Sequence, residues 1–298
     1  MVTIIHNCIF DNLIIKSVFM KARLLILLGL SFGVVITSCN KDDSKDDLSY
    51  SIEAAEDNSL SSALFTDALK QIEEIHLQQD EDNKMILDTS CAIITVTQAD
   101  SSDDYIWKAK IDFGTTGCEY NGRTRKGVLY FTTTGRYRDS ATVVKAWTDN
   151  YYVDDYKLEG TKTVTNMGRN GDGDLYYKVE VNNGVITSTV DGSVRTWQTT
   201  RFNTWVAGES TTLNWWDDEY DVSGSATGVT HSGKNYSINI TENLRVKILC
   251  KWIQDGNLEI NVQDIPTIYV DYGVGSLTPC DNQAKATISG QDYTFYMN

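Results

Sequence analysis

Most of the chain alternates between apolar and polar residues with a period of two. The alternation is cleanest in the second half, at residues 236–240, 244–248, 258–262 and 268–270. Five earlier stretches are rich in Val, Ile, Thr and aromatic residues, which favour strands: 91–97, 105–113, 128–134, 142–147 and 157–165. An alternating strand turns its apolar side chains to one face of a sheet and its polar side chains to the other. The pattern therefore predicts antiparallel strands that are half buried.

Short turn signals that contain Gly separate these stretches. They are Asn170-Gly171-Asp172-Gly173, Asn183-Gly184, Asp191-Gly192, Ser232-Gly233, Asp255-Gly256 and Ser289-Gly290. Gly, Asn and Asp supply the positive φ angles that tight hairpins require, so consecutive strands should be neighbours. We predict an all-β fold, a large antiparallel meander of about fifteen strands that forms an open twisted sheet, a sandwich or a barrel-like closure.

One stretch has a helical period instead. Its apolar residues recur every three or four positions: Leu60, Leu64, Phe65, Ala68, Leu69, Ile72 and Ile75. Asn58 or Ser59 can cap its start. We predict one N-terminal helix within residues 57–83, followed over residues 84–298 by an antiparallel β domain with internal repeat-like units.

The first 38 residues have the features of a leader. Lys21 and Arg23 precede an apolar run over residues 24–36, and small or polar residues lead to Cys39. This order is typical of a secretory signal peptide, and the run is too short to span a bilayer comfortably. Residues 36–39 resemble the lipobox of bacterial lipoproteins, which implies that Cys39 is lipidated and becomes the new N-terminus. We predict a signal peptide over residues 20–38 and interpret residues 1–19 as a mis-annotated start.

An acidic segment follows Cys39. Residues 39–56 have too little apolar surface to fold and are expected to form an acidic tether. Their Lys41-Asp42-Asp43 run resembles the signal that sends Bacteroidetes lipoproteins to the outer face of the outer membrane. The net charge of the chain is −15, and cleavage before Cys39 removes three basic residues and one acidic residue to leave −17. Such a surface repels phosphates, which excludes a nucleic acid partner.

Four further cysteines form two similar units. Cys91 and Cys118 flank Asp112-Phe113-Gly114, and Cys250 and Cys280 flank Asp271-Tyr272-Gly273, with the Asp 21 positions after the first Cys in both. An exported chain meets an oxidising compartment, so these thiols should be paired. The repeated spacing selects Cys91 with Cys118 and Cys250 with Cys280. A zinc site is disfavoured because the short Cys-x-x-Cys spacing is missing.

The most suggestive cluster for ligand binding combines tryptophan with acids. It comprises Trp205, Trp215, Trp216, Asp217, Asp218 and Glu219. Tryptophan beside carboxylates suits a sugar that stacks on the ring and whose hydroxyls hydrogen-bond to the acids, or a cation held against aromatic faces. Alternatively, the tryptophans fill the core and the acids lie in a solvated loop. We take these six residues as candidate ligand-binding residues.

The sequence offers no catalytic set or cofactor motif. His76 and His231 are the histidines beyond the leader, and neither belongs to a credible Ser-His-Asp or Cys-His set. Residues 170–174 have acids at alternate positions, but Leu175 and Val181 stand where a calcium loop requires Gly and Glu, so a hairpin turn is favoured. We predict no catalytic residue, no metal and no cofactor. Carboxylates are abundant, so a glycosidase pair stays possible, although no pair can be singled out.

Several motifs recur in a recognisable combination. They are Ile111-Asp112-Phe113-Gly114, Asn121-Gly122-Arg123-Thr124-Arg125-Lys126-Gly127, Gly135-Arg136-Tyr137-Arg138-Asp139, Gly224-Ser225-Ala226-Thr227-Gly228 and Val270-Asp271-Tyr272-Gly273. Together with Cys118 and Cys280 they resemble a group of Bacteroidetes lipoproteins with no assigned activity. The resemblance spans most of the β region. It implies an envelope setting, supports the disulfide units and supplies no catalytic residue.

Taken together, these patterns predict an outer-membrane lipoprotein that is lipid-anchored at Cys39 and faces the cell exterior. Its expected role is a non-catalytic binding or envelope-structural module. The expected partners are the membrane, through the lipid, and a glycan or another surface protein. The alternative is a carboxylate-dependent hydrolase that acts on carbohydrate.

Overall fold

The computed structural model describes residues 43–82, 91–98, 104–120, 122–211, 217–247, 250, 252–273 and 280–296. Within them the chain forms one helix, α2 (Asp43–Asp82), and fourteen strands. The strands are β1 (Ile93–Gln98), β2 (Trp107–Asp112), β3 (Cys118–Tyr120), β4 (Arg123–Thr133), β5 (Val143–Val153), β6 (Tyr156–Arg169), β7 (Leu175–Ser188), β8 (Val194–Ala207), β9 (Glu219–Val229), β10 (Asn235–Lys247), β11 (Asp255–Val262), β12 (Ile268–Asp271), β13 (Gln283–Ile288) and β14 (Gln291–Tyr296).

The strands form a single antiparallel sheet that follows the chain. From β4 to β14 each strand pairs with its neighbours in the sequence, β1 pairs with β2, and both β2 and β3 pair with β4. The sheet is open, with β1 and β14 at its two edges. The predicted all-β meander with one N-terminal helix is confirmed. Of the three predicted arrangements, namely an open sheet, a sandwich and a barrel-like closure, the structure has the open sheet.

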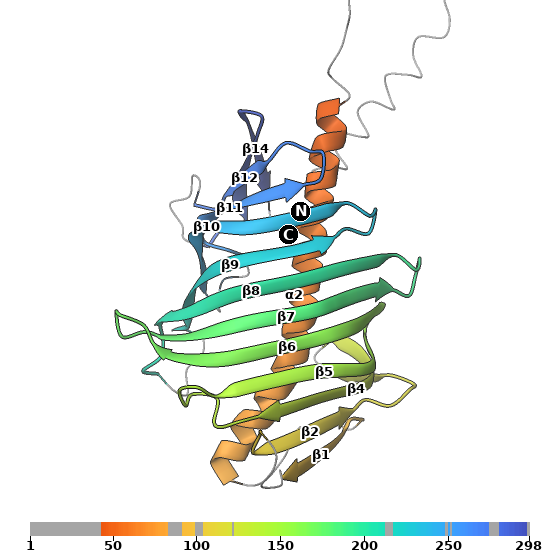
Figure 1. The fold of residues 1–298 in the computed structure, drawn as a ribbon, viewed down its shortest axis with the longest axis vertical. Helices are drawn as coiled ribbons and strands as arrows, with labels where there is room; N and C mark the ends of the chain where they lie inside the picture. Colours follow the sequence, from red (N-terminus) through yellow and green to blue (C-terminus); the bar gives the residue numbers. More distant parts are fainter. Residues whose placement is uncertain are drawn as a thin grey trace, which may run out of the picture.

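Alternate side chains of the strands build the core. In β11, Leu258, Ile260 and Val262 are buried while the residues between them are partly exposed. Figure 1 shows α2 running across the strands along one face of the sheet. The buried side chains of the strands form one apolar cluster with Leu64, Phe65 and other residues of α2. The period of two in the apolar residues therefore arises from a sheet that is covered on one face.

Two of the predicted turns lie inside or at the start of strands. Asn183 and Gly184 fall within β7, where the pairing with β8 shifts register. Asp255 and Gly256 begin β11. Similarly, the two strands expected at 236–240 and 244–248 belong largely to β10, which is bent by a register shift between Asn239 and Leu244. A β-bulge uses the same positive φ angles as a hairpin turn, which is why the residues alone do not distinguish them.

Helix α2 is longer than the sequence predicts, because it begins at Asp43 rather than at residue 57. Residues 43–56, expected as an acidic tether, form its first turns. Ser51 and Ala54 are fully buried there and continue the buried face of Leu64 and Ala68 towards the N-terminus. This face consists of small and polar residues, so apolar periodicity does not reveal it. Among the described residues, no helix has a stretch apolar enough to cross a membrane.

Two acidic residues of α2 fix the helix to the sheet. Asp67 accepts hydrogen bonds from Arg125 Nε (3.0 Å) and Nη2 (2.7 Å), and Arg125 Nη1 donates to the carbonyl oxygen of Tyr120 (2.8 Å). Asp57 accepts a single hydrogen bond from Arg195 Nε, more than a hundred residues away in the chain. Arg125 is 1% exposed and Asp57 is 4% exposed, so both pairs are shielded from water.

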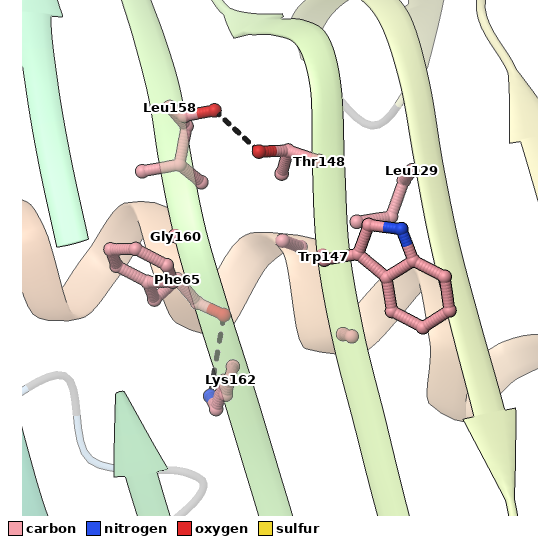
Figure 2. Close-up of a pocket in the computed structure, with 9 residues that line it drawn as sticks. Phe65, Leu129, Trp147, Thr148, Leu158, Gly160 and Lys162 are labelled. Carbon is pink, nitrogen blue, oxygen red and sulfur yellow. Dashed lines mark hydrogen bonds between the residues drawn. The ribbon is translucent and has the colours of Figure 1, made fainter. Parts of the chain in front are cut away.

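The contact between α2 and the centre of the sheet is tightly packed. Figure 2 shows the void between them, which has a volume of about 10 Å³ and lies beside Phe65, Leu158 and Lys162. Lys162 Nζ donates a hydrogen bond to the carbonyl oxygen of Phe65 (3.3 Å). A void of this size holds at most one water molecule, so it is a packing defect and not a ligand site.

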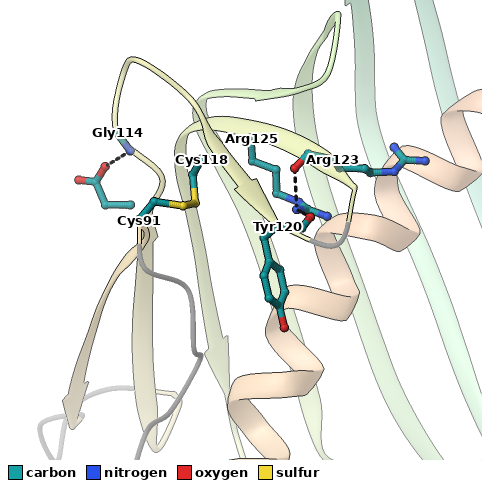
Figure 3. The surroundings of a disulfide bond; sticks show 7 residues. Cys91, Gly114, Cys118, Tyr120, Arg123 and Arg125 are labelled. Atoms are coloured by element: carbon teal, nitrogen blue, oxygen red, sulfur yellow. Dashed lines mark hydrogen bonds between the residues drawn. A yellow bond between two sulfur atoms is a disulfide. The ribbon is translucent and has the colours of Figure 1, made fainter.

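Both predicted disulfides are present in the structure. Cys91 is bonded to Cys118, and Cys250 is bonded to Cys280, with Cα atoms 5.4 and 5.6 Å apart. Figure 3 shows the first of them beside the turn at Gly114. This bond ties the segment before β1 to the first residue of β3.

The repeated Asp-aromatic-Gly motif has one local structure in both units. Asp112 Oδ1 accepts a hydrogen bond from the Gly114 amide (3.0 Å), and Asp271 Oδ1 accepts one from the Gly273 amide (3.1 Å). The amide of the intervening aromatic residue donates to the carbonyl oxygen of a glycine with positive φ, Gly127 in one unit and Gly256 in the other. A Cβ at either glycine would collide with the backbone of a neighbouring strand, β5 in one unit and β10 in the other. The motif therefore ends a strand beside a bulge and has a structural role.

Candidate functional site

A polar hollow of about 440 Å³ opens where β6 and β8 end. Its walls come from the end of β6, the turn that follows it, the end of β8 and the residues after β8. The lining residues are Arg169, Asp174, Trp205, Val206, Ala207, Gly208, Glu209 and Ser210. A hollow of this volume with converging polar groups is within the range that small-molecule ligands occupy.

An ion pair forms one wall of the hollow. Arg169 donates from Nη2 to Glu209 Oε1 (2.5 Å) and from Nη1 to Glu209 Oε2 (2.9 Å). The Arg169 hydrogen bond lowers the pKa of Glu209 below its usual value, so this carboxylate is ionised at neutral pH. Arg169 Nη1 also donates to the carbonyl oxygen of Gly173 (2.8 Å), which ties the pair to the β6–β7 turn. The two side chains present both a fixed donor and a fixed acceptor to a ligand.

Trp205 lies at the wall of the hollow with its ring largely covered. It is 6% exposed. The guanidinium of Arg138 lies 4.8 Å from its ring centroid, and Tyr220, its partner on β9, stacks against it with centroids 5.7 Å apart. The cation-on-aromatic arrangement considered from the sequence is thus made by an arginine of the chain itself. Little of the ring remains for a sugar to stack upon.

Asp218 is a buried carboxyl group next to this hollow. It is 7% exposed, and its Oδ1 has no hydrogen-bond partner among the described residues. The hollow-lining Gly208 lies so close that a Cβ there would collide with Asp218 Oδ1. Burial raises the pKa of Asp218, although Trp205 and Tyr220 partly oppose this. A carboxyl with a raised pKa is more readily protonated than Glu209.

The other predicted site residues are held in different ways. Thr211 Oγ1 lies 2.9 and 3.0 Å from the two carboxylate oxygens of Asp217, to which it can donate its single hydrogen. Glu219 is bound by Lys247 Nζ (2.5 Å) and Arg245 Nη1 (3.4 Å), and the Lys247 hydrogen bond is the main cause of its lowered pKa. Residues 212–216, with Trp215 and Trp216, lie outside the described residues, as does the predicted lipidation site Cys39. The structure therefore brings Trp205 and Asp218 together at the hollow, whereas Glu219 pairs with basic residues of β10.

The ion pair of the hollow and the cation that covers Trp205 come from three separate places in the chain. Arg169 is the last residue of β6, Glu209 lies in the connection between β8 and β9, and Arg138 lies in the connection between β4 and β5. Each follows or precedes a turn, and only the meander topology places the three turns at the same end of the sheet. The one available signal was the placement of charged residues beside glycine-containing turns, which also describes ordinary solvated loops.

A second group of side chains has the chemistry of metal ligands. Glu53 and Asp57 on α2 and His231 in the β9–β10 turn each offer one ligand atom, and these atoms all lie within 4.8 Å of one another. His231 is separated from Asp57 by 174 positions, so the sequence does not reveal the contact. The side chain of His76 lies outside the described part.

Comparison of this chain with family models, with curated proteins and with solved structures finds no match. The described residues form an open antiparallel meander that packs against one long helix and carries a polar hollow where β6 and β8 end.

Proposed function

We propose that this protein is an exported lipoprotein, anchored through Cys39 in the outer membrane and facing the cell exterior, that acts as a non-catalytic binding module. The leader over residues 20–38, the lipobox-like residues 36–39 and the Lys41-Asp42-Asp43 run support this location. The two disulfides fit an oxidising compartment. The resemblance to Bacteroidetes lipoproteins agrees with the same setting.

The ligand we propose is a carbohydrate that binds in the hollow at the ends of β6 and β8. The observation that carries this proposal is the fixed Arg169–Glu209 pair in the wall of an open, polar hollow of about 440 Å³. Sugar hydroxyls both donate and accept hydrogen bonds, so a wall that offers a guanidinium beside a carboxylate suits them. Trp205 also lines the hollow, but Arg138 and Tyr220 cover its ring, so the proposal rests on hydrogen bonding and not on stacking.

A glycan array tests the ligand. We expect the wild-type protein to bind a subset of glycans and Arg169→Ala to lose at least about tenfold in affinity, because both sides of the hydrogen-bonding wall are disturbed. Lys157→Ala is the matched control, since Lys157 forms a similar surface pair with Glu159 (3.0 Å) away from the hollow. Equal binding by wild type and Arg169→Ala, or no binding to any glycan, would count against the proposal.

A separate experiment tests the anchor. Cys39→Ser should abolish lipidation and move the protein from the membrane fraction to the soluble fraction, because the lipid is the proposed attachment. Incorporation of labelled fatty acid and detergent phase partitioning measure this, and protease treatment of intact cells measures exposure at the surface. Ser44→Ala, which lies beyond the proposed cleavage position, is the control and should change nothing. Membrane attachment that survives Cys39→Ser would overturn the anchor.

The second candidate function is a carboxylate-dependent hydrolase. It is favoured by the difference between Asp218, whose pKa burial raises, and Glu209, whose pKa Arg169 lowers. Two carboxyl groups with pKa values pushed apart can serve as acid and base. Turnover of a bound glycan that Asp218→Asn abolishes, with binding retained, would favour the enzyme over the binding module.

A further inference from the structure

The Glu53, Asp57 and His231 group lies where the first half of α2 meets the β9–β10 turn. Asp57 is 4% exposed, Glu53 is 15% exposed and His231 is 41% exposed. The two carboxylates stand four residues apart on α2, which places them on one face of the helix, one turn apart. The group is therefore buried on the helix side and open to solvent on the histidine side.

The ligand atoms of this group have the spacing of a metal site. His231 Nδ1 lies 3.0 Å from Asp57 Oδ2 and 3.3 Å from Glu53 Oε1. Zinc binds imidazole nitrogen and carboxylate oxygen at about 2.0–2.2 Å in tetrahedral geometry, which puts its ligand atoms roughly 3.3 Å apart. The two separations that involve His231 are close to this edge length, and all three ligand atoms lie within 4.8 Å of one another.

Backbone and side-chain donors hold both carboxylates in place. The His231 amide donates to Asp57 Oδ2 (2.7 Å), and the Ser232 amide donates to Glu53 Oε1 (2.9 Å). Arg195 Nε donates to the other oxygen of Asp57. Such outer contacts orient the ligands of a metal without occupying every lone pair.

The local charges also favour a cation. Glu56 stands between Glu53 and Asp57 in the sequence, and its carboxyl interacts electrostatically with Glu53, Asp57 and His231. Three carboxylates thus lie within one turn of α2, and Arg195 neutralises one negative charge. Lys234 lies near the same helix, but its ammonium is placed over the ring of Tyr50 (5.0 Å). An excess of negative charge in a half-buried position is stabilised by a bound cation.

From this geometry we propose that Glu53, Asp57 and His231 bind one divalent cation of the zinc type, with a solvent molecule in the fourth position. The nitrogen ligand and the small number of oxygen ligands select zinc over calcium, which takes six to eight oxygens. The ion joins α2 to the β9–β10 turn and so stabilises the packing of the helix against the sheet. The proposal does not depend on carbohydrate binding at the hollow.

Isothermal titration of the mature chain, produced without a histidine tag, tests the proposal with ZnCl₂ as the probe. We expect one zinc ion per chain, a rise of the melting temperature with zinc, and at least about a tenfold loss of affinity in His231→Ala and in Glu53→Gln. Substitution by Co²⁺ should give the visible absorption of a four-coordinate site, and His231→Ala should lose it. Calcium should bind more weakly than zinc.

Glu56→Gln is the matched control, because it removes a neighbouring carboxylate that is not a proposed ligand and should retain the stoichiometry. Both ligand variants replace partly exposed side chains, and circular dichroism of each shows whether the fold is retained. Absence of zinc binding, or zinc binding that is unchanged in His231→Ala and Glu53→Gln, overturns the proposal. In that case His231 is only a hydrogen-bond and ion-pair partner of Asp57 and Glu53.

Discussion

Arg125→Ala should lower the free energy of unfolding by about 3–5 kcal/mol, the range measured when one partner of a buried ion pair is removed. Arg125 is 1% exposed and satisfies both oxygens of Asp67 and the carbonyl oxygen of Tyr120. Without the guanidinium, the Asp67 carboxylate stays between α2 and the sheet with its main partner lost. Urea denaturation followed by tryptophan fluorescence measures the change.

Arg123→Ala is the control for this prediction. Arg123 is 35% exposed and lies 3.8 Å from Asp67 and 3.6 Å from Asp154, so its removal should cost about 0–1 kcal/mol. The double variant Arg125→Leu/Asp67→Leu should recover much of the loss, because no charge is then left buried. Equal losses for Arg123→Ala and Arg125→Ala would show that the buried pair is not a principal attachment of the helix.

Removal of the Cys91–Cys118 disulfide should lower the free energy of unfolding by about 3–4 kcal/mol in the chain-entropy model. The bond closes a loop with a sequence separation of 27, and opening it increases the conformational entropy of the unfolded chain. Cys91→Ala/Cys118→Ala avoids a free thiol and is compared with the oxidised wild type by urea denaturation.

The second disulfide provides the matched comparison. Its sequence separation is 30, so Cys250→Ala/Cys280→Ala should lose nearly the same amount. Reductant added to the wild type should reproduce the sum of the two losses, provided that the sites do not interact. An unchanged midpoint in both double variants would falsify the idea that the two bonds stabilise the fold.

The sheet could be predicted from the sequence because its signal is local. Alternation such as that of Leu258, Ile260 and Val262 follows directly from the geometry of a strand with one buried face. The cysteine pairing could be predicted because the spacing recurs. Bulges could not be separated from turns, since Gly184 and Gly192 carry the same information in the sequence although one lies within β7 and the other in a hairpin.

The candidate sites were predicted less well because they depend on contacts between distant segments. Trp205 was found through its chemistry, but its partner Arg138 comes from another loop. Asp57 and His231 meet only after α2 lies on the sheet. The start of α2 was missed because Ser51 and Ala54 are buried without being strongly apolar. Small and polar residues of this kind are buried because of how the helix packs on the sheet, and a hydrophobicity pattern does not show that.

The meander connectivity has a consequence for the order in which the protein assembles. Neighbouring strands are close in sequence, so hairpins can form as the chain lengthens and pay little loop-closure entropy. The contact of Glu53 with Ser232 spans 179 positions and must wait until most of the sheet exists. Helix α2 precedes the whole sheet in the chain, yet its ion pairs with Arg125 and Arg195 can form only once β4 and β8 are in place.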